Sequence, residues 1–220
     1  MKRTWILSVL VIVGFLLATG CRARFKKYAK KSSGVQVRPN VTSGPTVDLA
    51  ANDDGEAQSQ AEAMTNLATG IAGAAAGAKV RKRLVSVLGP NDIEKMIDDG
   101  VKKGLGGGPP FPYRKKKGDG TLQIEVERYG VVNEGDGPIF VVDYDVGIFR
   151  KKDNKRVYRN SVRCRDGNFF LGGPESDALN TVATIAFFEN MSDAQLQKRI
   201  RRTFRACTAR LVSQMQKHAS

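Results

Sequence analysis

The sequence predicts an α+β domain over residues 61–220, in which an antiparallel sheet of about three or more strands packs against N- and C-terminal helices. Three segments, 122–127, 138–149 and 156–165, alternate apolar and polar side chains with the period of a half-buried strand. Apolar residues at helical spacing flank these segments on both sides. The hydrophobic share of 41% and the charged share of 26% are those of a folded globular chain.

The first predicted helix is rich in small residues. It follows the acidic stretch Asp53–Glu56 and holds Gly70, Gly73 and Gly77 among many alanines. Each glycine inside a helix costs about 1 kcal/mol relative to alanine, so three of them indicate close approach of another backbone. Two alternatives stay open: self-association of the protein through residues 67–80, or packing of this helix on its own sheet.

A second helix is predicted from about Asp92 to Lys103, with Asn91 as its N-cap. Its apolar residues share one face: Ile93, Met96, Ile97 and Val101. The loop 104–112, rich in glycine and proline, ends the helix. This loop follows a helix and lacks the Gly-Lys-Ser or Gly-Lys-Thr of a phosphate-binding loop, so no nucleotide or other cofactor is expected.

The second and third strands are predicted to form a hairpin around residues 152–155, where Lys-Asp-Asn-Lys is a turn signal. A loop with an odd number of residues, such as 153–155, keeps apolar side chains on one face and polar ones on the other. The register then predicts two apolar pairs and two pairs of opposite charge: Val146–Val162, Tyr144–Cys164, Asp145–Arg163 and Asp143–Arg165.

Four carboxylates are expected on the polar face of the sheet: Glu125, Glu127, Asp143 and Asp145. A calcium or magnesium site needs oxygens converging from loops, and an acid pair for sugar hydrolysis needs a cleft with one desolvated acid. These residues lie instead on flat strands beside arginines. We therefore expect a solvated face with cross-strand ion pairs, and neither a metal site nor catalytic residues.

Two helices are predicted at the C-terminal end, one opened by residues 174–177 and one capped by Ser192. The apolar face of the last helix is Ile200, Phe204, Cys207, Leu211 and Met215. Its opposite face is basic: Lys198, Arg199, Arg201, Arg202 and Arg205. Cys164 and Cys207 both fall on core-facing positions, and we predict that they form a disulfide in an oxidising compartment. The alternative is two buried thiols.

The first 20 residues have the three-part build of an export signal. Lys2 and Arg3 precede an apolar run from Trp5 to Ala18, which at about 14 residues is shorter than the roughly 20 of a membrane-spanning helix. Small residues then lead to Cys21.

This ending resembles the lipobox of bacterial lipoproteins, although Ala18 stands where the family usually has leucine. The resemblance implies removal of the signal peptide 1–20, lipid on Cys21 as diacylglycerol and fatty acid, and attachment to a membrane. Arg22 follows the cysteine instead of the aspartate that retains enterobacterial lipoproteins at the inner membrane. The resemblance therefore implies the outer membrane, and the alternative is an uncleaved signal anchor or a simple secretory leader.

Residues 21–60 are predicted to be a basic, flexible tether. Its cations lie next to the expected anchor and could meet anionic lipid: Arg22, Arg24, Lys26, Lys27, Lys30 and Lys31. Serine, glycine and proline then interrupt any helical or strand period. A merely solvated spacer is the alternative.

The composition favours a binding protein over an enzyme. The net charge of +14 favours anionic partners, such as another envelope protein or an anionic polymer, and the exported location excludes most contact with nucleic acid. The only histidine, His218, lies near the C-terminus, and no catalytic cluster is evident.

We expect a noncatalytic envelope lipoprotein that supports assembly, transport or adhesion. The alternatives are an enzyme acting on cell wall or polysaccharide, and a homo-oligomer. The element order loosely resembles envelope lipoprotein domains of the TolB N-terminal or curli-secretion type.

Overall fold

The computed structural model describes residues 23–48, 75, 77–106, 112–115, 117–133, 138–167 and 181–220. The predicted signal peptide 1–20, Cys21, Arg22 and most of the small-residue segment 67–80 lie outside these residues. In the described part of the chain, no helix is both long enough and apolar enough to cross a bilayer.

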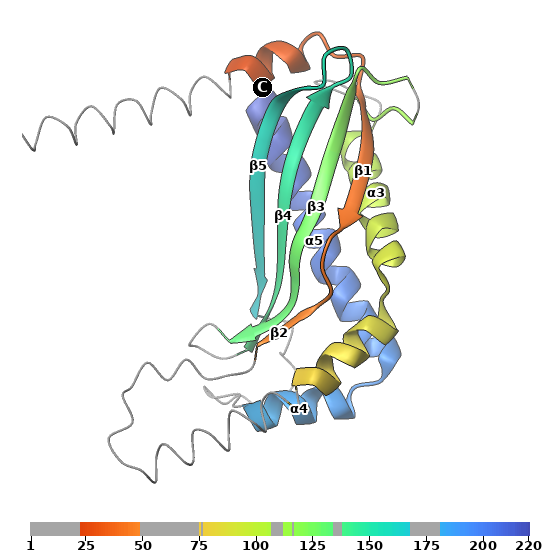
Figure 1. Cartoon of the computed structure of the whole chain (residues 1–220), viewed down its shortest axis with the longest axis vertical. Helices are drawn as coiled ribbons and strands as arrows, with labels where there is room; N and C mark the ends of the chain where they lie inside the picture. The colour runs from red at the N-terminus through yellow and green to blue at the C-terminus, as the bar shows by residue number, and fades with distance from the viewer. Residues whose placement is uncertain are drawn as a thin grey trace, which may run out of the picture.

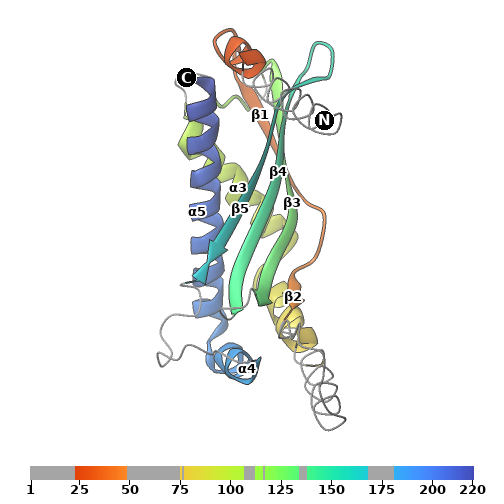
Figure 2. The ribbon, with the colours of Figure 1, turned by 90° about the vertical axis from the view of Figure 1, so that its left-hand side faces the viewer.

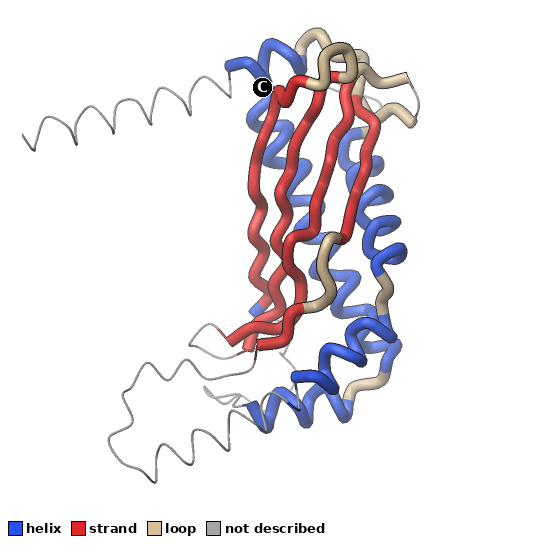
Figure 3. The backbone as a smooth tube through the Cα atoms, in the orientation of Figure 1, coloured by secondary structure: helices blue, strands red, loops and turns tan. Residues whose placement is uncertain are grey.

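The described strands form one mixed sheet of five strands (Figure 3). They are β1 (Val35–Val41), β2 (Thr46–Asp48), β3 (Gly120–Asn133), β4 (Pro138–Arg150) and β5 (Lys155–Asp166). Strands β3, β4 and β5 are antiparallel neighbours, whereas β1 and β2 both pair with β3 in parallel. The α+β class is confirmed, and β3, β4 and β5 are the predicted antiparallel strands. The prediction did not include β1 and β2, which join β3 in parallel and make the sheet mixed.

Residues 23–48 belong to the folded domain, so the prediction of a flexible tether over 21–60 is wrong for this part of the chain. Residues 23–29 form a short helix. The helix buries one apolar stripe: Phe25, Tyr28 and Ala29. The stripe has helical spacing, but it is only one turn long and lies among arginine and lysine residues. The sequence pattern therefore resembles that of a charged linker.

Strand β1 was also assigned to the tether, because Pro39 lies inside it and proline cannot donate to a sheet. No described strand lies on the outer side of β1. The N–H group that Pro39 lacks therefore leaves no strand-to-strand hydrogen bond unmade on that side. Val35, at the start of β1, is fully buried. The N-terminal strands thus contribute to the core of the domain.

Helices α3 (Pro90–Leu105) and α5 (Asp193–Ala219) lie side by side on one face of the sheet, and the core fills the space between (Figure 1, Figure 2). The two helices approach closely: a Cβ added at Gly104 would lie 2.9 Å from Cγ1 of Val212. No described helix covers the opposite face of the sheet. The domain is therefore two-layered, with one face of its sheet left open.

The start of α3 differs from the prediction. Gly89 is its N-cap and Pro90 takes the first helical position, so the assignment of Asn91 as cap is wrong. Proline is favoured at this position because its fixed φ suits the first turn and its missing N–H would have had no partner. The predicted apolar face is confirmed, with Ile93 and Ile97 fully buried.

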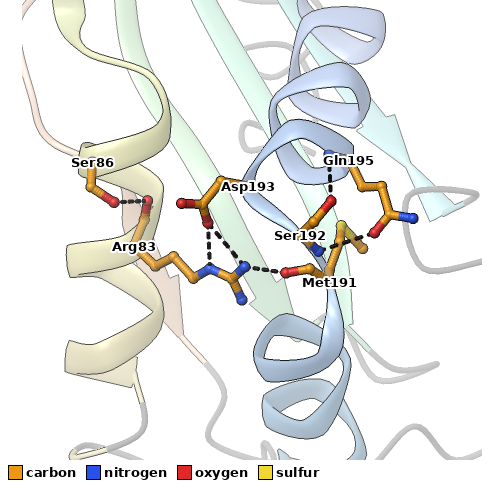
Figure 4. A network of polar contacts seen from close by, with 6 residues as sticks. All are labelled: Arg83, Ser86, Met191, Ser192, Asp193 and Gln195. Atoms are coloured by element: carbon orange, nitrogen blue, oxygen red, sulfur yellow. Dashed lines mark hydrogen bonds and ion pairs between the residues drawn. The ribbon is translucent and has the colours of Figure 1, made fainter.

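The junction between α4 (Thr181–Asn190) and α5 is capped as predicted (Figure 4). The Ser192 hydroxyl accepts a hydrogen bond from the Gln195 backbone N–H at 3.3 Å, and the Gln195 side chain accepts one from the Ser192 N–H at 3.0 Å. This reciprocal capping box satisfies two N–H groups that the first turn of α5 leaves without helical partners.

The same junction is tied to the helical residues 77–87 (Figure 4). Nε of Arg83 donates to Oδ1 of Asp193 at 3.1 Å, and its guanidinium also donates to the Met191 carbonyl. The arginine therefore fastens this N-terminal helix to the start of α5.

Gly77 is the one glycine of the predicted small-residue set that the structure describes, since Gly70 and Gly73 lie outside the described residues. A Cβ at Gly77 would lie 3.6 Å from Cγ1 of Val47 in β2. This glycine therefore packs against the sheet of its own chain, which is one of the two predicted alternatives.

The β4–β5 hairpin has the predicted faces but a different register. Tyr144 pairs with Val162 and Asp143 pairs with Arg163, two residues from the predicted partners. A four-residue turn, 151–154, replaces the predicted loop, and a bulge follows at the start of β5. Together they move the register by two residues, which leaves every side chain on its predicted face.

Cys164 of β5 and Cys207 of α5 form a disulfide, with their Cα atoms 5.8 Å apart. Both residues are buried, as core-facing positions require. The bond joins the sheet to α5 across 43 positions of sequence, in agreement with the expectation from the sequence.

Candidate functional site

The short helix at residues 23–29 is fixed to one end of the sheet by aromatic packing. The Phe25 ring is fully buried, and its centroid lies 4.3 Å from that of Tyr158 in β5. The Tyr158 hydroxyl lies 3.1 Å from Nδ1 of His218, near the end of α5. The helix is thus held against both layers of the domain and is not part of a linker.

This helix and the β4–β5 turn lie at the same end of the sheet (Figure 1), and both carry a dense set of exposed cations. We call this set the basic end: Arg24, Lys26, Lys27, Lys30, Lys31, Lys151, Lys152, Lys155 and Arg156. Side chains from the helix and from the hairpin line one shared cleft of about 510 Å³. The two groups therefore form a single cationic surface.

The acidic residues of this end are engaged with neighbours. Asp119 accepts hydrogen bonds from the hydroxyls of Ser32 at 2.6 Å and Tyr28 at 3.3 Å. Burial raises the pKa of Tyr28 to about 12, so its phenol stays protonated and donates at neutral pH. The hydrogen bond from Arg150, with Nε 2.8 Å from Oδ1, lowers the pKa of Asp153 to about 2. Asp119 and Asp153 therefore stabilise the local structure through these hydrogen bonds, and the surrounding lysines remain exposed.

The structure brings five of the six predicted membrane-surface cations together on the basic end: Arg24, Lys26, Lys27, Lys30 and Lys31. Arg22 and the predicted lipidation site Cys21 lie outside the described residues. Two residues of chain span at most about 7 Å, so a lipid on Cys21 would lie beside the helix at residues 23–29. The basic end and the expected anchor are therefore adjacent by covalent geometry alone.

Sequence reasoning missed the contribution of the β4–β5 turn to this surface. The turn itself was predicted, and its lysines are visible in the sequence as Lys151, Lys152 and Lys155. Periodicity does not show against which end of a sheet an N-terminal helix packs. The sequence alone therefore could not place the two basic segments on one surface. The aromatic pair Phe25–Tyr158 supplies that information only in three dimensions.

Two of the four carboxylates on the open face of the sheet, Asp143 and Asp145, form cross-strand ion pairs; the predicted pair Asp143–Arg165 is present, whereas Asp145 pairs with Arg159 in place of Arg163. Asp143 is buried between Arg128 and Arg165, with N–O distances of 2.9 and 3.1 Å. Asp145 lies 3.5 Å from Arg159. Among the described side chains, no group of three or more His, Cys, Asp or Glu residues is placed to hold a metal ion.

Comparison with known proteins gives only partial likenesses. No protein-family model matches the sequence, and no curated protein matches it. A Xanthomonas campestris protein of the family DUF330 aligns with a TM-score of 0.38 and 13% identity over 57% of this chain. That alignment spans 62% of the Xanthomonas chain, so more than a third of that protein has no counterpart here.

Two further solved structures align with similar coverage. A hypothetical protein of Chlamydia trachomatis has a TM-score of 0.33 and 11% identity, over 56% of this chain and 86% of its own. A Caulobacter crescentus protein, provisionally described as a lipoprotein, has a TM-score of 0.27 and 12% identity, over 56% of this chain and 83% of its own.

Proposed function

We propose that this protein is a lipid-anchored protein of the bacterial cell envelope whose domain lies with its basic end on an anionic membrane surface. Its role there is noncatalytic partner binding in assembly, transport or adhesion. The observation that carries the proposal is the place of the basic end, which begins within three residues of Cys21. The outer membrane is the proposed location, because Arg22 follows the cysteine.

The physical basis is the combination of lipid and charge at one place. Two or more acyl chains hold a protein stably on a bilayer, because each buried methylene contributes about 0.8 kcal/mol. Each Lys or Arg close to an anionic surface adds about 1 kcal/mol of attraction. A docked helix beside the anchor leaves little free chain, so the domain would keep one end on the membrane and would not swing on a long linker.

The engagement of the ionisable side chains supports a binding role over catalysis. His218 is within hydrogen-bond distance of a core tyrosine, and Asp143 and Asp145 on the open sheet face are paired with arginines. A catalytic acid or base needs its proton-transfer atom available to a substrate in a cleft.

Lipidation is tested by metabolic labelling with an alkyne fatty acid. The wild-type protein should take up the label and fractionate with membranes, and the variant Cys21→Ser should do neither. Labelling that persists in the variant, or a wild-type protein that stays unlabelled, would contradict the anchor.

Docking of the basic end is tested separately, with the chain from residue 22, which contains every described residue. We expect tighter binding to phosphatidylglycerol vesicles than to phosphatidylcholine vesicles in cosedimentation. Neutralising three cations should weaken binding on the order of 100-fold at low salt, at about 1 kcal/mol per cation. The variant carries Lys26→Gln, Lys27→Gln and Lys30→Gln.

The matched control removes the same charge from exposed cations on the helical residues 77–87 and the first half of α3: Arg81→Gln, Lys82→Gln and Lys95→Gln. This control should bind vesicles nearly as tightly as the unmodified chain. Equal loss in both variants would show that net charge alone governs binding, and docking through the basic end would be wrong.

A further inference from the structure

Strand β5 is an edge strand, and the directions of its backbone groups can be worked out. The N–H of Lys151, just after β4, donates to the carbonyl of Asp119, just before β3, at 2.8 Å. In an antiparallel ladder, alternate residues bond to opposite neighbours, so odd-numbered β4 residues bond to β3 and even-numbered ones to β5. Tyr144 and its partner Val162 are therefore a hydrogen-bonded pair.

It follows that alternate β5 residues direct both backbone groups away from β4. These residues are Arg159, Ser161, Arg163 and Arg165. A second observation agrees: Nη1 of Arg210, on α5, donates to the Arg163 carbonyl at 3.2 Å. No described strand pairs with this edge. Apart from the Arg163 carbonyl, which Arg210 already engages, its outward N–H and C=O groups could bond to a further strand.

Cations flank this edge on both sides. On the open face of the sheet, the exposed side chains of Arg159, Arg163 and Arg165 follow the strand. On the helical side, a groove of about 930 Å³ separates β5 from α5. We call it the β5 groove; its lining includes Lys198, Arg199, Arg202 and Arg210 of α5, and also Arg165, whose guanidinium pairs with Asp143 on the open face.

Asp166 is the one acidic residue among those that line the β5 groove. Its Oδ2 accepts a hydrogen bond from the Thr203 hydroxyl at 2.5 Å and lies 3.8 Å from Arg202. The carboxylate is thus engaged within the wall of the groove. Cations therefore outnumber carboxylates in the β5 groove, while on the open face Arg159 and Arg165 are paired with Asp145 and Asp143 and Arg163 adds a further cation.

We propose that β5 binds an extended acidic segment of a partner protein, which adds to the sheet as a sixth strand beyond the β5 edge. Backbone hydrogen bonds to Ser161 and its alternate neighbours supply affinity that does not depend on side chains. The side chains of an added strand point alternately to the two faces of the sheet. Carboxylates on one face meet the β5 arginines, and those on the other meet the β5 groove.

The charges favour this occupant over a second copy of the chain. Antiparallel pairing of two β5 strands about Ser161 would place Arg159 of one copy opposite Arg163 of the other. Parallel pairing would set each arginine beside its own counterpart. Like charges directly opposite each other destabilise a strand pair, whereas opposite charges stabilise it.

The β5 groove lies away from the basic end. Nine positions separate Arg156 from Arg165, a distance of about 30 Å along an extended strand. Ser161, midway along the edge, lines a cleft with Lys26, so the edge of β5 meets the basic end there. On a domain anchored as proposed above, the groove would stand clear of the lipid surface and remain open to a partner. Strand addition itself does not require the anchor, so the two proposals fail independently.

The test measures binding of a fluorescent ten-residue peptide of alternating Glu and Thr to the full chain in neutral detergent, by polarisation. A further probe carries the same residues with N-methyl groups on every amide. Strand addition needs peptide N–H donors, so the methylated peptide should bind at least tenfold more weakly than the unmethylated one. Absence of binding by the unmethylated peptide, or equal binding by both, would overturn the proposal. Equal binding would indicate a surface for anionic polymers.

Protein variants give a second measurement. Ser161→Pro removes one outward N–H and leaves the bonds to β4 intact, so it should weaken binding roughly two- to tenfold, as the loss of one hydrogen bond does. Ser161→Ala is the matched control and should bind normally. Neutralising Lys27, Lys30 and Lys31 at the basic end, none of which lines the cleft beside Ser161, should leave peptide affinity unchanged while vesicle binding falls, which separates failure of this proposal from failure of membrane docking.

Discussion

The molecule has two basic surfaces that differ in residue type and in backbone geometry. The basic end is rich in lysine and projects from a short helix and a turn. The β5 groove is rich in arginine and runs along a strand edge. Lysine is a strongly hydrated point charge suited to a diffuse anionic surface, whereas arginine forms directed, paired hydrogen bonds with carboxylates. The two groups of cations therefore differ in chemistry.

The largest expected effect comes from removing the support of the basic end. Phe25→Ala should lower the free energy of unfolding by about 3–5 kcal/mol, because a fully buried ring is lost. Chemical denaturation measures this loss. Phe187→Ala, at a half-buried position, should cost less. A cost below about 1 kcal/mol for Phe25→Ala would mean that the helix is not packed as described.

Removing the disulfide should act on the other surface. The double variant Cys164→Ser with Cys207→Ser should lose roughly 3–4 kcal/mol of stability, from the entropy of a loop of 43 positions. Because the bond joins β5 to α5 along the β5 groove, peptide affinity should fall while vesicle binding persists. Equal loss of both activities would contradict the separation of the two surfaces. Mapping of disulfides without reduction checks the bond itself.

A smaller effect is expected at the capping box of α5, where Ser192 itself lines neither surface although its partner Gln195 lines the β5 groove. Ser192→Ala removes one capping hydrogen bond and should cost about 1 kcal/mol. Vesicle binding and peptide binding should both stay near their original values. Thermal unfolding and the two binding assays measure these quantities, and a large change in either affinity would connect this junction to function.

The smallest effect concerns pH at the basic end. The folded pKa of Asp153, about 2, lies below its ordinary value, so the ion pair with Arg150 contributes above the ordinary pKa. That contribution is lost as pH falls through about 2, and it is small because the pair is exposed. Titration of the Asp153 carboxyl by NMR should show the low midpoint, and Arg150→Gln should raise it. An unchanged midpoint in the variant would rule out this cause.

The sequence predicted the parts of the fold that have long, regular patterns. The three antiparallel strands, the apolar face of α5 and the disulfide between Cys164 and Cys207 all follow from periodicity. The helix at residues 23–29 and β1 were missed. The helix is too short for its apolar stripe to stand out among the surrounding cations. Strand β1 contains Pro39, and proline is tolerated there because β1 is an edge strand.

The candidate sites were harder to predict than the elements that carry them. The cations near Cys21 were recognised, but their union with the β4–β5 turn depends on Phe25 packing against Tyr158, a contact between residues far apart in sequence. The β5 groove likewise needs the position of α5 relative to an edge strand. Local patterns describe one element at a time, whereas both surfaces are formed by two elements.

The most direct test of membrane docking uses the lipidated full chain on anionic vesicles that carry a headgroup-linked fluorescence quencher. With Cys21 acylated and the other two cysteines joined, a new single cysteine can be labelled. The label at Lys152→Cys, on the basic end, should be strongly quenched, and the label at Lys82→Cys, on the helix at residues 77–87, should not. Equal quenching at both positions, or quenching only at position 82, would contradict a domain that rests on the membrane through its basic end.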